Sequence, residues 1–442
     1  MGDGCEALGA SVSVLRLLGL WVPTESSGAG GKAAYVPGAL SCVAIGLLSL
    51  SCASKLFIDT PTELTELTVC AYLFVIITAN FVKAFCLLLQ QGTLHELVTL
   101  LVEAKKKNVI DVQHNEDIRS LYGVMSARLY RYLQVMIVVS SVAWLFVTVV
   151  FRVITAGSTN IEWPTPLPIW LPLDTQRSPA YELVYVAQVS CAVVTAATML
   201  GADTLFFHLT LMIVAELQVL NDNVSVLGRP APPSADTRQV VCTMNGAGER
   251  QTHPPGGVAE RQSDSDGAVS LSDHQGTAAA ESKYLVLIEI IQHHQIIIKM
   301  VSLLQTIMDY SVSVQLLTNV LDMCFLIFTM SELLHHEKSL HAVLQTILSL
   351  PCLLCESGAF CMFGQMIIDQ SENLVHAAFS CEWLEADGRF RKPLYTFMLM
   401  ATHPLQIKLG GTAKLSRSTF LQALNGSYSL INLLYHSRRP VG

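Results

Sequence analysis

The chain has 442 residues, of which 51% are hydrophobic and only 14% are charged. Soluble globular domains are about 25% charged, so this composition argues against ordinary soluble domains and indicates a membrane protein. The net charge of −8 argues against a basic surface for nucleic acid, and we expect no nucleic-acid partner.

The sequence carries no pattern typical of a catalytic, metal or cofactor site. Most of the 12 cysteines lie in apolar runs, where a free thiol behaves as a small hydrophobic side chain. Cys352 and Cys355 have zinc-like spacing, but no second pair of ligands accompanies them. No Ser-His-Asp set, phosphate-binding loop or HExxH sequence occurs. We therefore expect no metal, no cofactor and no enzymatic activity.

Apolar segments that are long enough to cross a bilayer as helices recur along the chain. The predicted spans are 36–58, 67–90, 132–154, 180–216, 296–330, 342–368 and 413–436. The fourth and fifth are longer than a bilayer needs and are expected to extend into the cytoplasm. The shorter stretch 393–407 contains Pro404 and is expected to form a helix buried in protein beneath the membrane. The predicted fold class is an all-α membrane protein with seven transmembrane helices.

The distribution of Lys and Arg predicts the orientation of these helices, because positive charge favours the cytoplasmic side. With the N-terminus inside, the cytoplasmic segments hold 19 of these residues and the outer segments hold six. The N-terminus is therefore predicted to be cytoplasmic and the C-terminus extracellular. This is the reverse of a G-protein-coupled receptor, and the Asp-Arg-Tyr and Asn-Pro-x-x-Tyr signatures of those receptors are missing.

The predicted organisation has five parts. They are a cytoplasmic N-terminal segment (1–35), a six-helix transmembrane bundle (36–368), a disordered cytoplasmic insertion within it (225–283), a cytoplasmic region (369–412), and the seventh span with its tail (413–442). The insertion is rich in Pro, Gly, Ser, Asp and Gln, and cannot bury enough apolar area to offset the entropy of ordering. The proline-rich outer loop 155–179 is expected to cover the bundle as a rigid lid.

Specific motifs lie near the C-terminal end. They are Phe360-Cys-Met-Phe-Gly-Gln365, Asp369-Gln-Ser, His376-Ala-Ala-Phe-Ser-Cys-Glu-Trp383, Pro404-Leu-Gln-Ile-Lys-Leu-Gly-Gly411, Leu415-Ser-x-x-Thr-Phe420 and Ser427-Tyr-Ser429. These sequence motifs resemble the sixth span, the following helix and the closing signature of insect odorant receptors and their shared co-receptor. Weaker similarities lie at Asp203-Thr-Leu-Phe, Gln218-x-Leu220 and His293-His-Gln295.

The resemblance implies a ligand-gated cation channel in the plasma membrane of olfactory sensory neurons. Such a channel is a tetramer in which an odorant-binding subunit assembles with co-receptor subunits. The resemblance places most subunit contacts at the cytoplasmic ends of spans four to six and in the helix before span seven. The 369–412 region fits this plan, with Trp383 and Phe379 available as contact residues.

The resemblance also implies that span seven lines the pore. Ile431, Leu434 and Tyr435 share one helical face near its end. Four apolar faces around an axis would block ions by dewetting, which makes these residues the predicted gate. The alternative is that this apolar face packs against spans five and six. Leu434 stands where the co-receptor has a polar residue.

The same family places an odorant pocket in the outer half of the bundle, between spans two, three, four and six. A pocket for a small volatile odorant should be apolar and aromatic with one or two polar groups. The candidate residues are Ile137, Ser140, Trp144 and Thr148 on span three, Tyr72 on span two, Tyr185, Gln188 and Ala192 on span four, and Leu348 on span six. The alternative for each is ordinary helix packing.

Ionisable residues within predicted spans cost free energy in the bilayer, so each needs a structural or functional explanation. Lys83 lies near the inner end of span two and is expected to extend toward the membrane surface. Asp203 is expected to bond a neighbouring span, and Asp322 lies within span five.

Several alternatives remain open within this prediction. The co-receptor itself, or a homomeric odorant-gated channel, is the nearest alternative to an odorant-binding subunit. A gustatory receptor would share the architecture, but its Thr-Tyr-x-x-x-x-x-Gln-Phe ending is missing. A G-protein-coupled receptor is the most distant alternative.

Overall fold

The computed structural model is a bundle of long helices, with a two-stranded hairpin near its C-terminal end. It describes the backbone of residues 9–22, 33–107, 110–155, 165–171, 177–227, 266–336, 340–381, 383 and 386–438. Within these ranges, side chains are not described for 9–11, 64–65, 147, 151–155, 266–280, 333–336, 340–345 and 434–438.

Among the described residues, six helices are long and apolar enough to cross a membrane. These are α4 (Val36–Phe57), α5 (Leu64–Leu89), α7 (Val112–Thr155), α8 (Ala180–Val226), α10 (Asp266–His336) and α11 (Leu340–Ser380). They contain the first six predicted spans, apart from Ile58 and Gln90, which cap α4 and α5. The seventh span corresponds to α13 (Arg417–Arg438), which is not among the six, so its crossing of the membrane stays a prediction.

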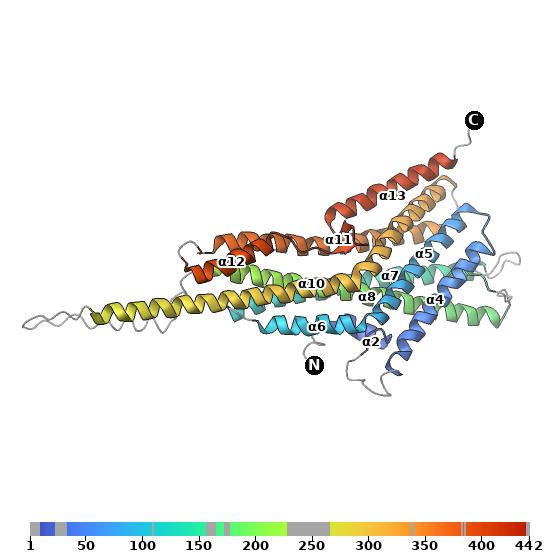
Figure 1. Cartoon of the computed structure of the whole chain (residues 1–442). Helices are drawn as coiled ribbons and strands as arrows, with labels where there is room; N and C mark the ends of the chain where they lie inside the picture. Colours follow the sequence, from blue (N-terminus) through green and yellow to red (C-terminus); the bar gives the residue numbers. More distant parts are fainter. Residues whose placement is uncertain are drawn as a thin grey trace, which may run out of the picture.

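Four helices are much longer than the roughly 20 residues that a bilayer requires. Helices α7, α8, α10 and α11 have 44, 47, 71 and 41 residues. They run alongside one another beyond α4 and α5, together with α6 (Gln91–Lys106) and α12 (Gly388–Ala401) (Figure 1). The extension of α8 and α10 was predicted from their apolar length, whereas that of α7 and α11 was not.

Two predicted segments differ from the structure. The predicted helix 393–407 instead begins at Gly388, where the side chain of Asp387 accepts a hydrogen bond from the Gly388 amide at 2.6 Å, and it ends at Ala401. Pro404 follows this end, and proline cannot continue a helix because it has no amide hydrogen to donate. The predicted disordered insertion 225–283 contains helical residues at both ends, since α8 includes residues 225 and 226 and α10 begins at Asp266. Residues 228–265 lie outside the described residues.

The motif at 360–365 holds α11 against the start of α13. A Cβ atom on Gly364 would lie 2.4 Å from the carbonyl oxygen of Leu415, so only glycine permits this approach. The side chain of Gln365 accepts a hydrogen bond from the Arg417 amide at 3.3 Å. Between α12 and α13, strands β1 (Lys408–Leu409) and β2 (Ala413–Lys414) pair in an antiparallel hairpin.

Apolar side chains cover much of the outer surface of the helices predicted to span the membrane. On α7, Val135, Val139, Phe146 and Val149 are exposed. Exposed apolar rows of this kind are unusual on soluble proteins but match a lipid environment. The exposed rows therefore agree with a multi-pass membrane protein.

A buried ionic cluster joins three of the long helices, α7, α8 and α10. The guanidinium of Arg119 on α7 binds both carboxylate oxygens of Glu216 on α8, at 2.8 and 3.0 Å. His293 Nε2 on α10 lies 3.1 Å from Glu216 Oε2. All three residues are at most 5% exposed, so removal of Glu216 would take the buried carboxylate away from both basic side chains.

We predict that Glu216→Ala destabilises the folded protein by about 3 kcal/mol, because the buried guanidinium of Arg119 would lose its bidentate partner and keep the ion pair with the more exposed Glu116. Thermal unfolding of detergent-purified protein measures the effect. Glu96→Ala is the matched control, since it removes the exposed ion pair between Glu96 and Lys299 and should cost at most about 1 kcal/mol. Equal losses in the two variants would contradict the structural role of the cluster.

Candidate functional site

A cavity of about 500 Å³ lies between α5, α7 and α8. Its walls are mainly aliphatic and aromatic, and its few polar side chains include Asn80, Gln134, Ser141 and Thr195. This volume and composition are typical of small-molecule pockets in proteins. The loop between α7 and α8 also contributes, because Pro166 and Leu167 line the cavity.

Trp144 on α7 connects the cavity with this loop. The indole ring lines the cavity, and its Nε1–H donates a hydrogen bond to the carbonyl oxygen of Pro166 at 2.9 Å. Nearby, the Leu167 amide donates to Oε1 of the buried Gln188 on α8 at 3.1 Å. The described part of the predicted lid is therefore fixed to both α7 and α8.

A smaller cavity of about 190 Å³ lies beside the first and extends to α11. Tyr72, Ile137 and Trp144 line both cavities, which places the two spaces next to each other. Ser140 lines the smaller cavity, with its Oγ 3.3 Å from Cys352 Sγ. The α11 side of this cavity is formed by Ser349, Cys352, Leu353 and Glu356.

The structure thus brings together five of the nine predicted pocket residues at the two cavities. These are Tyr72, Ile137, Ser140, Trp144 and Ala192. The other four do not line either cavity. Thr148 is buried and donates to the Trp144 carbonyl oxygen, Tyr185 stacks obliquely near Tyr181, Gln188 holds the loop, and Leu348 accepts a hydrogen bond from Cys352.

Sequence reasoning missed several lining residues, including Asn80, Tyr130, Met199 and Glu356. Asn80 could have been found, because it lies eight residues after Tyr72 and so on the same face of span two. Glu356 could have been found as an acidic residue inside the sixth apolar segment, which is uncommon without a functional or structural reason.

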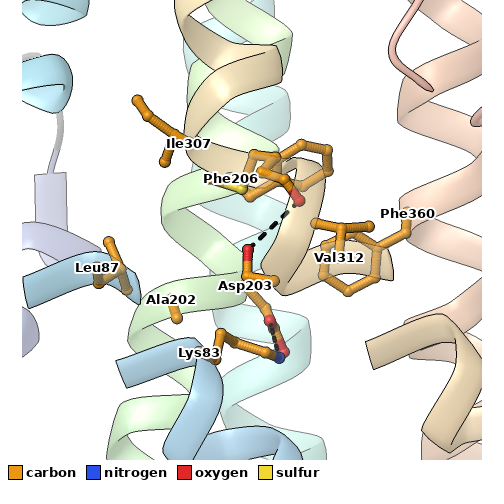
Figure 2. Close-up of a pocket in the computed structure, with 10 residues that line it drawn as sticks. Lys83, Leu87, Ala202, Asp203, Phe206, Ile307, Val312 and Phe360 are labelled. Carbon is orange, nitrogen blue, oxygen red and sulfur yellow. Dashed lines mark hydrogen bonds and ion pairs between the residues drawn. The ribbon is translucent and has the colours of Figure 1, made fainter. Parts of the chain in front are cut away.

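Below the cavities, a buried ionic cluster joins α5, α8 and α11. Lys83 Nζ lies 2.5 Å from Asp203 Oδ1 and 3.5 Å from Glu356 Oε1. Figure 2 shows the Lys83 and Asp203 side chains directed toward each other, with Phe206 and Phe360 nearby. The expectation that Lys83 extends to the membrane surface is wrong, because the residue is 5% exposed and paired with carboxylates. The expectation that Asp203 bonds a neighbouring span is confirmed.

The predicted gate residues lie on α13, which packs against α10 and α11. Ile431 is 7% exposed in the single chain. One turn earlier, Ser427 Oγ donates to the carbonyl oxygen of Val320 on α10 at 3.3 Å. The side chains of Leu434 and Tyr435 lie outside the described residues.

The two predicted subunit-contact residues differ in their surroundings. Phe379 is 58% exposed near the end of α11. Trp383 is half-buried and packs against the core of its own chain. Phe379 is therefore the more accessible of the two for a second chain. Among the described residues, no group of three or more potential ligands is arranged to hold a metal ion.

A comparison with family models identifies the class of protein. The model described as 7tm Odorant receptor matches residues 63–428, most of the chain. The chain belongs to this odorant receptor family. The receptor is accordingly not an enzyme, and its predicted membership of the family is confirmed.

Curated relatives of the receptor are insect odorant receptors of low identity. Odorant receptor 10 of Aedes albopictus is 28% identical over 165 residues, which cover 37% of the receptor and 43% of the relative. Odorant receptor Or1 of Anopheles gambiae is 23% identical over 310 residues, which cover 67% of the receptor and 68% of the relative. The chain thus spans less than half the length of the first of these relatives.

Solved structures share the fold of the receptor over nearly its whole length. The olfactory receptor OR5 of Machilis hrabei in complex with eugenol has a TM-score of 0.76, 15% identity and 98% coverage of both chains. The structure of OR5 described without a ligand has a TM-score of 0.72, 15% identity and 96% coverage of both chains. The predicted fold class, that of an all-α insect odorant receptor, is confirmed at the level of the fold.

We predict that Trp144→Ala shifts odorant responses while surface expression stays intact. The substitution enlarges the cavity and removes the hydrogen bond to Pro166. Loss of aromatic contacts and of one hydrogen bond should raise the half-maximal odorant concentration about tenfold or more for ligands that pack on the indole.

Current recordings over a ligand panel measure this shift. Phe146→Ala on the outer, exposed face of α7 is the control and should leave the dose-response curves unchanged. Unchanged curves for Trp144→Ala would exclude this side chain from the binding site.

Proposed function

We propose that the receptor is the odorant-binding subunit of a heteromeric, ligand-gated, non-selective cation channel. Such a channel would assemble as a tetramer with co-receptor subunits in the plasma membrane of olfactory sensory neurons. The observation that carries this proposal is the cavity of about 500 Å³, walled by apolar and aromatic side chains and covered by the outer loop. Its ligand would be a small volatile odorant.

The chemistry of the cavity suits such a ligand. A volatile molecule has few polar groups, so its affinity must come mainly from burial of apolar surface, at roughly 25 cal/mol per Å². The walls offered by Ile76, Ile77, Leu145 and Leu200 provide that surface. OR5, which shares the fold, was solved in complex with eugenol, itself a small molecule with an aromatic ring.

The packing of the helices offers a route from ligand to pore. Helix α5 forms one wall of the cavity and also packs along α10. Helix α10 in turn contacts α13. A ligand that binds more tightly to one arrangement of α5 shifts the population toward that arrangement, and α10 would pass the change to α13.

The pore itself remains part of the proposal. Span seven would line it, with Ile431, Leu434 and Tyr435 as the apolar gate. Ile431 is buried in the single chain, which agrees equally with the alternative that this face packs against α10. A test at Leu434 therefore separates the two alternatives.

The co-receptor subunit, or a homomeric channel, is the second candidate. The insertion before α10 and the sequence of residues 360–383 are similar to those of the co-receptor. The C-terminal sequence differs from that of the co-receptor, which favours an odorant-binding subunit. A gustatory receptor and a G-protein-coupled receptor remain the less favoured alternatives. Glycosylation tags at the two ends of the chain would test the predicted orientation, and a glycosylated N-terminus would contradict the proposal.

We predict odorant-gated cation currents when the receptor is expressed together with an insect co-receptor, and little or no current when it is expressed alone. Voltage-clamp recordings with a broad odorant panel measure both conditions. Surface labelling of the receptor provides the control for expression. Equal currents with and without the co-receptor would favour the homomeric channel instead.

We also predict that a cationic thiol reagent, applied with odorant, blocks the current of Leu434→Cys, because a pore-lining side chain becomes accessible when the gate opens. The unsubstituted receptor serves as the control for its own cysteines. The same reagent should have no effect on Leu421→Cys, which changes a side chain exposed on α13 nearer its start. No block of Leu434→Cys would remove this residue from the pore.

A further inference from the structure

The smaller cavity ends on an acidic residue. Glu356 on α11 is 5% exposed and lines the cavity of about 190 Å³, together with Ser140 and Ser349. Its Oε1 faces Lys83, 3.5 Å away. Its Oε2 is buried and accepts no hydrogen bond from an N–H group or a hydroxyl among the described residues, and the carboxyl group also lies within hydrogen-bond range of the Asp203 carboxyl group. A buried polar atom without a partner costs about 1–3 kcal/mol, so a partner supplied by a ligand would be favourable.

A second such atom lines the larger cavity. Asn80 on α5 is 1% exposed and donates its Nδ2–H to the carbonyl oxygen of Ile76 at 3.1 Å. A carbonyl oxygen only accepts hydrogen bonds, so this contact fixes the orientation of the amide. Asn80 Oδ1 is then left buried without a partner among the described residues. Both unpartnered atoms are oxygens that can accept a hydrogen bond.

The charges around Glu356 also favour a donor. One ammonium group, that of Lys83, lies within 3.5 Å of two carboxylates, those of Asp203 and Glu356. Asp322 on α10 adds a third carboxyl group that is fully buried and has both oxygens unpartnered in the described part of the chain. Acidic groups therefore outnumber the basic one in this buried region. A ligand group that carries positive charge or a polarised hydrogen would reduce the imbalance.

We propose that the smaller cavity is a polar subsite of the odorant pocket, in which Glu356 Oε2 accepts a hydrogen bond from the head group of the ligand. The ligand class is an odorant with an apolar body and a terminal hydrogen-bond donor, either a hydroxyl or an amine. The body fills the larger cavity, and the head group passes Tyr72 and Trp144, which line both spaces. This inference rests on the proposed odorant-binding function.

The test compares four compounds that share one apolar body and end in an amine, a hydroxyl, a methoxy group or a hydrogen atom. Half-maximal concentrations are measured by voltage clamp in cells that express the receptor with a co-receptor. Binding to the purified receptor is measured with the same four compounds. We expect the donor compounds to be about tenfold or more stronger than the methoxy and unsubstituted compounds, because a hydrogen bond to a charged group contributes about 1.5–3 kcal/mol. If only the hydroxyl compound is stronger than the methoxy compound, the site prefers a neutral donor on the ligand. If only the amine compound is stronger, the site prefers a cationic donor.

Glu356→Gln tests the role of the acid at nearly constant size. The amide lacks the negative charge, and when its oxygen faces Lys83 it presents an N–H to the cavity. The donor advantage, that is, the ratio of the half-maximal concentration of the methoxy compound to that of the amine or hydroxyl compound, should fall to about twofold or less. Responses to the unsubstituted compound should persist. Glu372→Gln is the matched control, because Glu372 is exposed on the same helix and should leave all four responses unchanged.

Ala196→Leu provides a second variant that does not alter the ionic cluster. Ala196 lines both cavities, so a leucine would narrow the space between them. The donor advantage should again disappear, because the head group no longer reaches Glu356. This variant keeps the proposal testable when Glu356→Gln fails to reach the cell surface.

Three results would overturn the subsite. They are equal potency of the donor and methoxy compounds, an unchanged donor advantage in both Glu356→Gln and Ala196→Leu, and an equal loss of all four responses in a surface-expressed variant. A receptor that responds equally to all four compounds overturns the subsite and leaves the odorant-binding function intact. A surface-expressed receptor that neither binds nor responds to any of them contradicts both.

Discussion

The structure depends on one ammonium group that is buried within the apolar part of the bundle. Lys83 binds Asp203 and lies near Glu356, so a single charge links α5, α8 and α11. A charge in this environment is stable only while its partners stay in place. The cluster therefore fixes the relative positions of three helices, of which α5 and α8 supply walls of both cavities and α11 lines the smaller one. The Nζ atom also lies 5.8 Å from the centre of the Phe360 ring, within the sequence motif that first indicated the family.

Two further sets of contacts hold the bundle on either side of the cavities. At the end near the loop between α7 and α8, Trp144 and Gln188 bind the backbone of residues 166 and 167. At the other end, Glu216 joins α7, α8 and α10 through Arg119 and His293. The walls between these contacts carry apolar side chains, which can adjust their packing at lower cost than ion pairs can separate. An odorant would therefore act where the bundle is most adaptable, and α10 would carry the change toward α13.

The sequence predicted the fold and the family, but only part of the site. Hydropathy alone located the six long apolar helices, because the absence of water forces each span to satisfy its own backbone. It did not predict the full lengths of α7 and α11, whose polar parts are stabilised by contacts with distant helices. Helical spacing placed Ile137 and Trp144 on a face of span three that lines a cavity, whereas Thr148 on the same predicted face packs against its own helix. The ion pairs of Lys83 could not be predicted, because its partners lie 120 and 273 residues away in the sequence.

The central claim is that an odorant occupies the space between α5, α7 and α8 and reaches toward α11. The most direct measurement is an electron cryomicroscopy structure of the receptor assembled with its co-receptor and saturated with an activating alcohol or amine. The account predicts ligand density enclosed by Tyr72, Ile137 and Trp144, with its polar end within hydrogen-bond distance of Glu356. Ligand density elsewhere in the receptor, with this space empty, would contradict it.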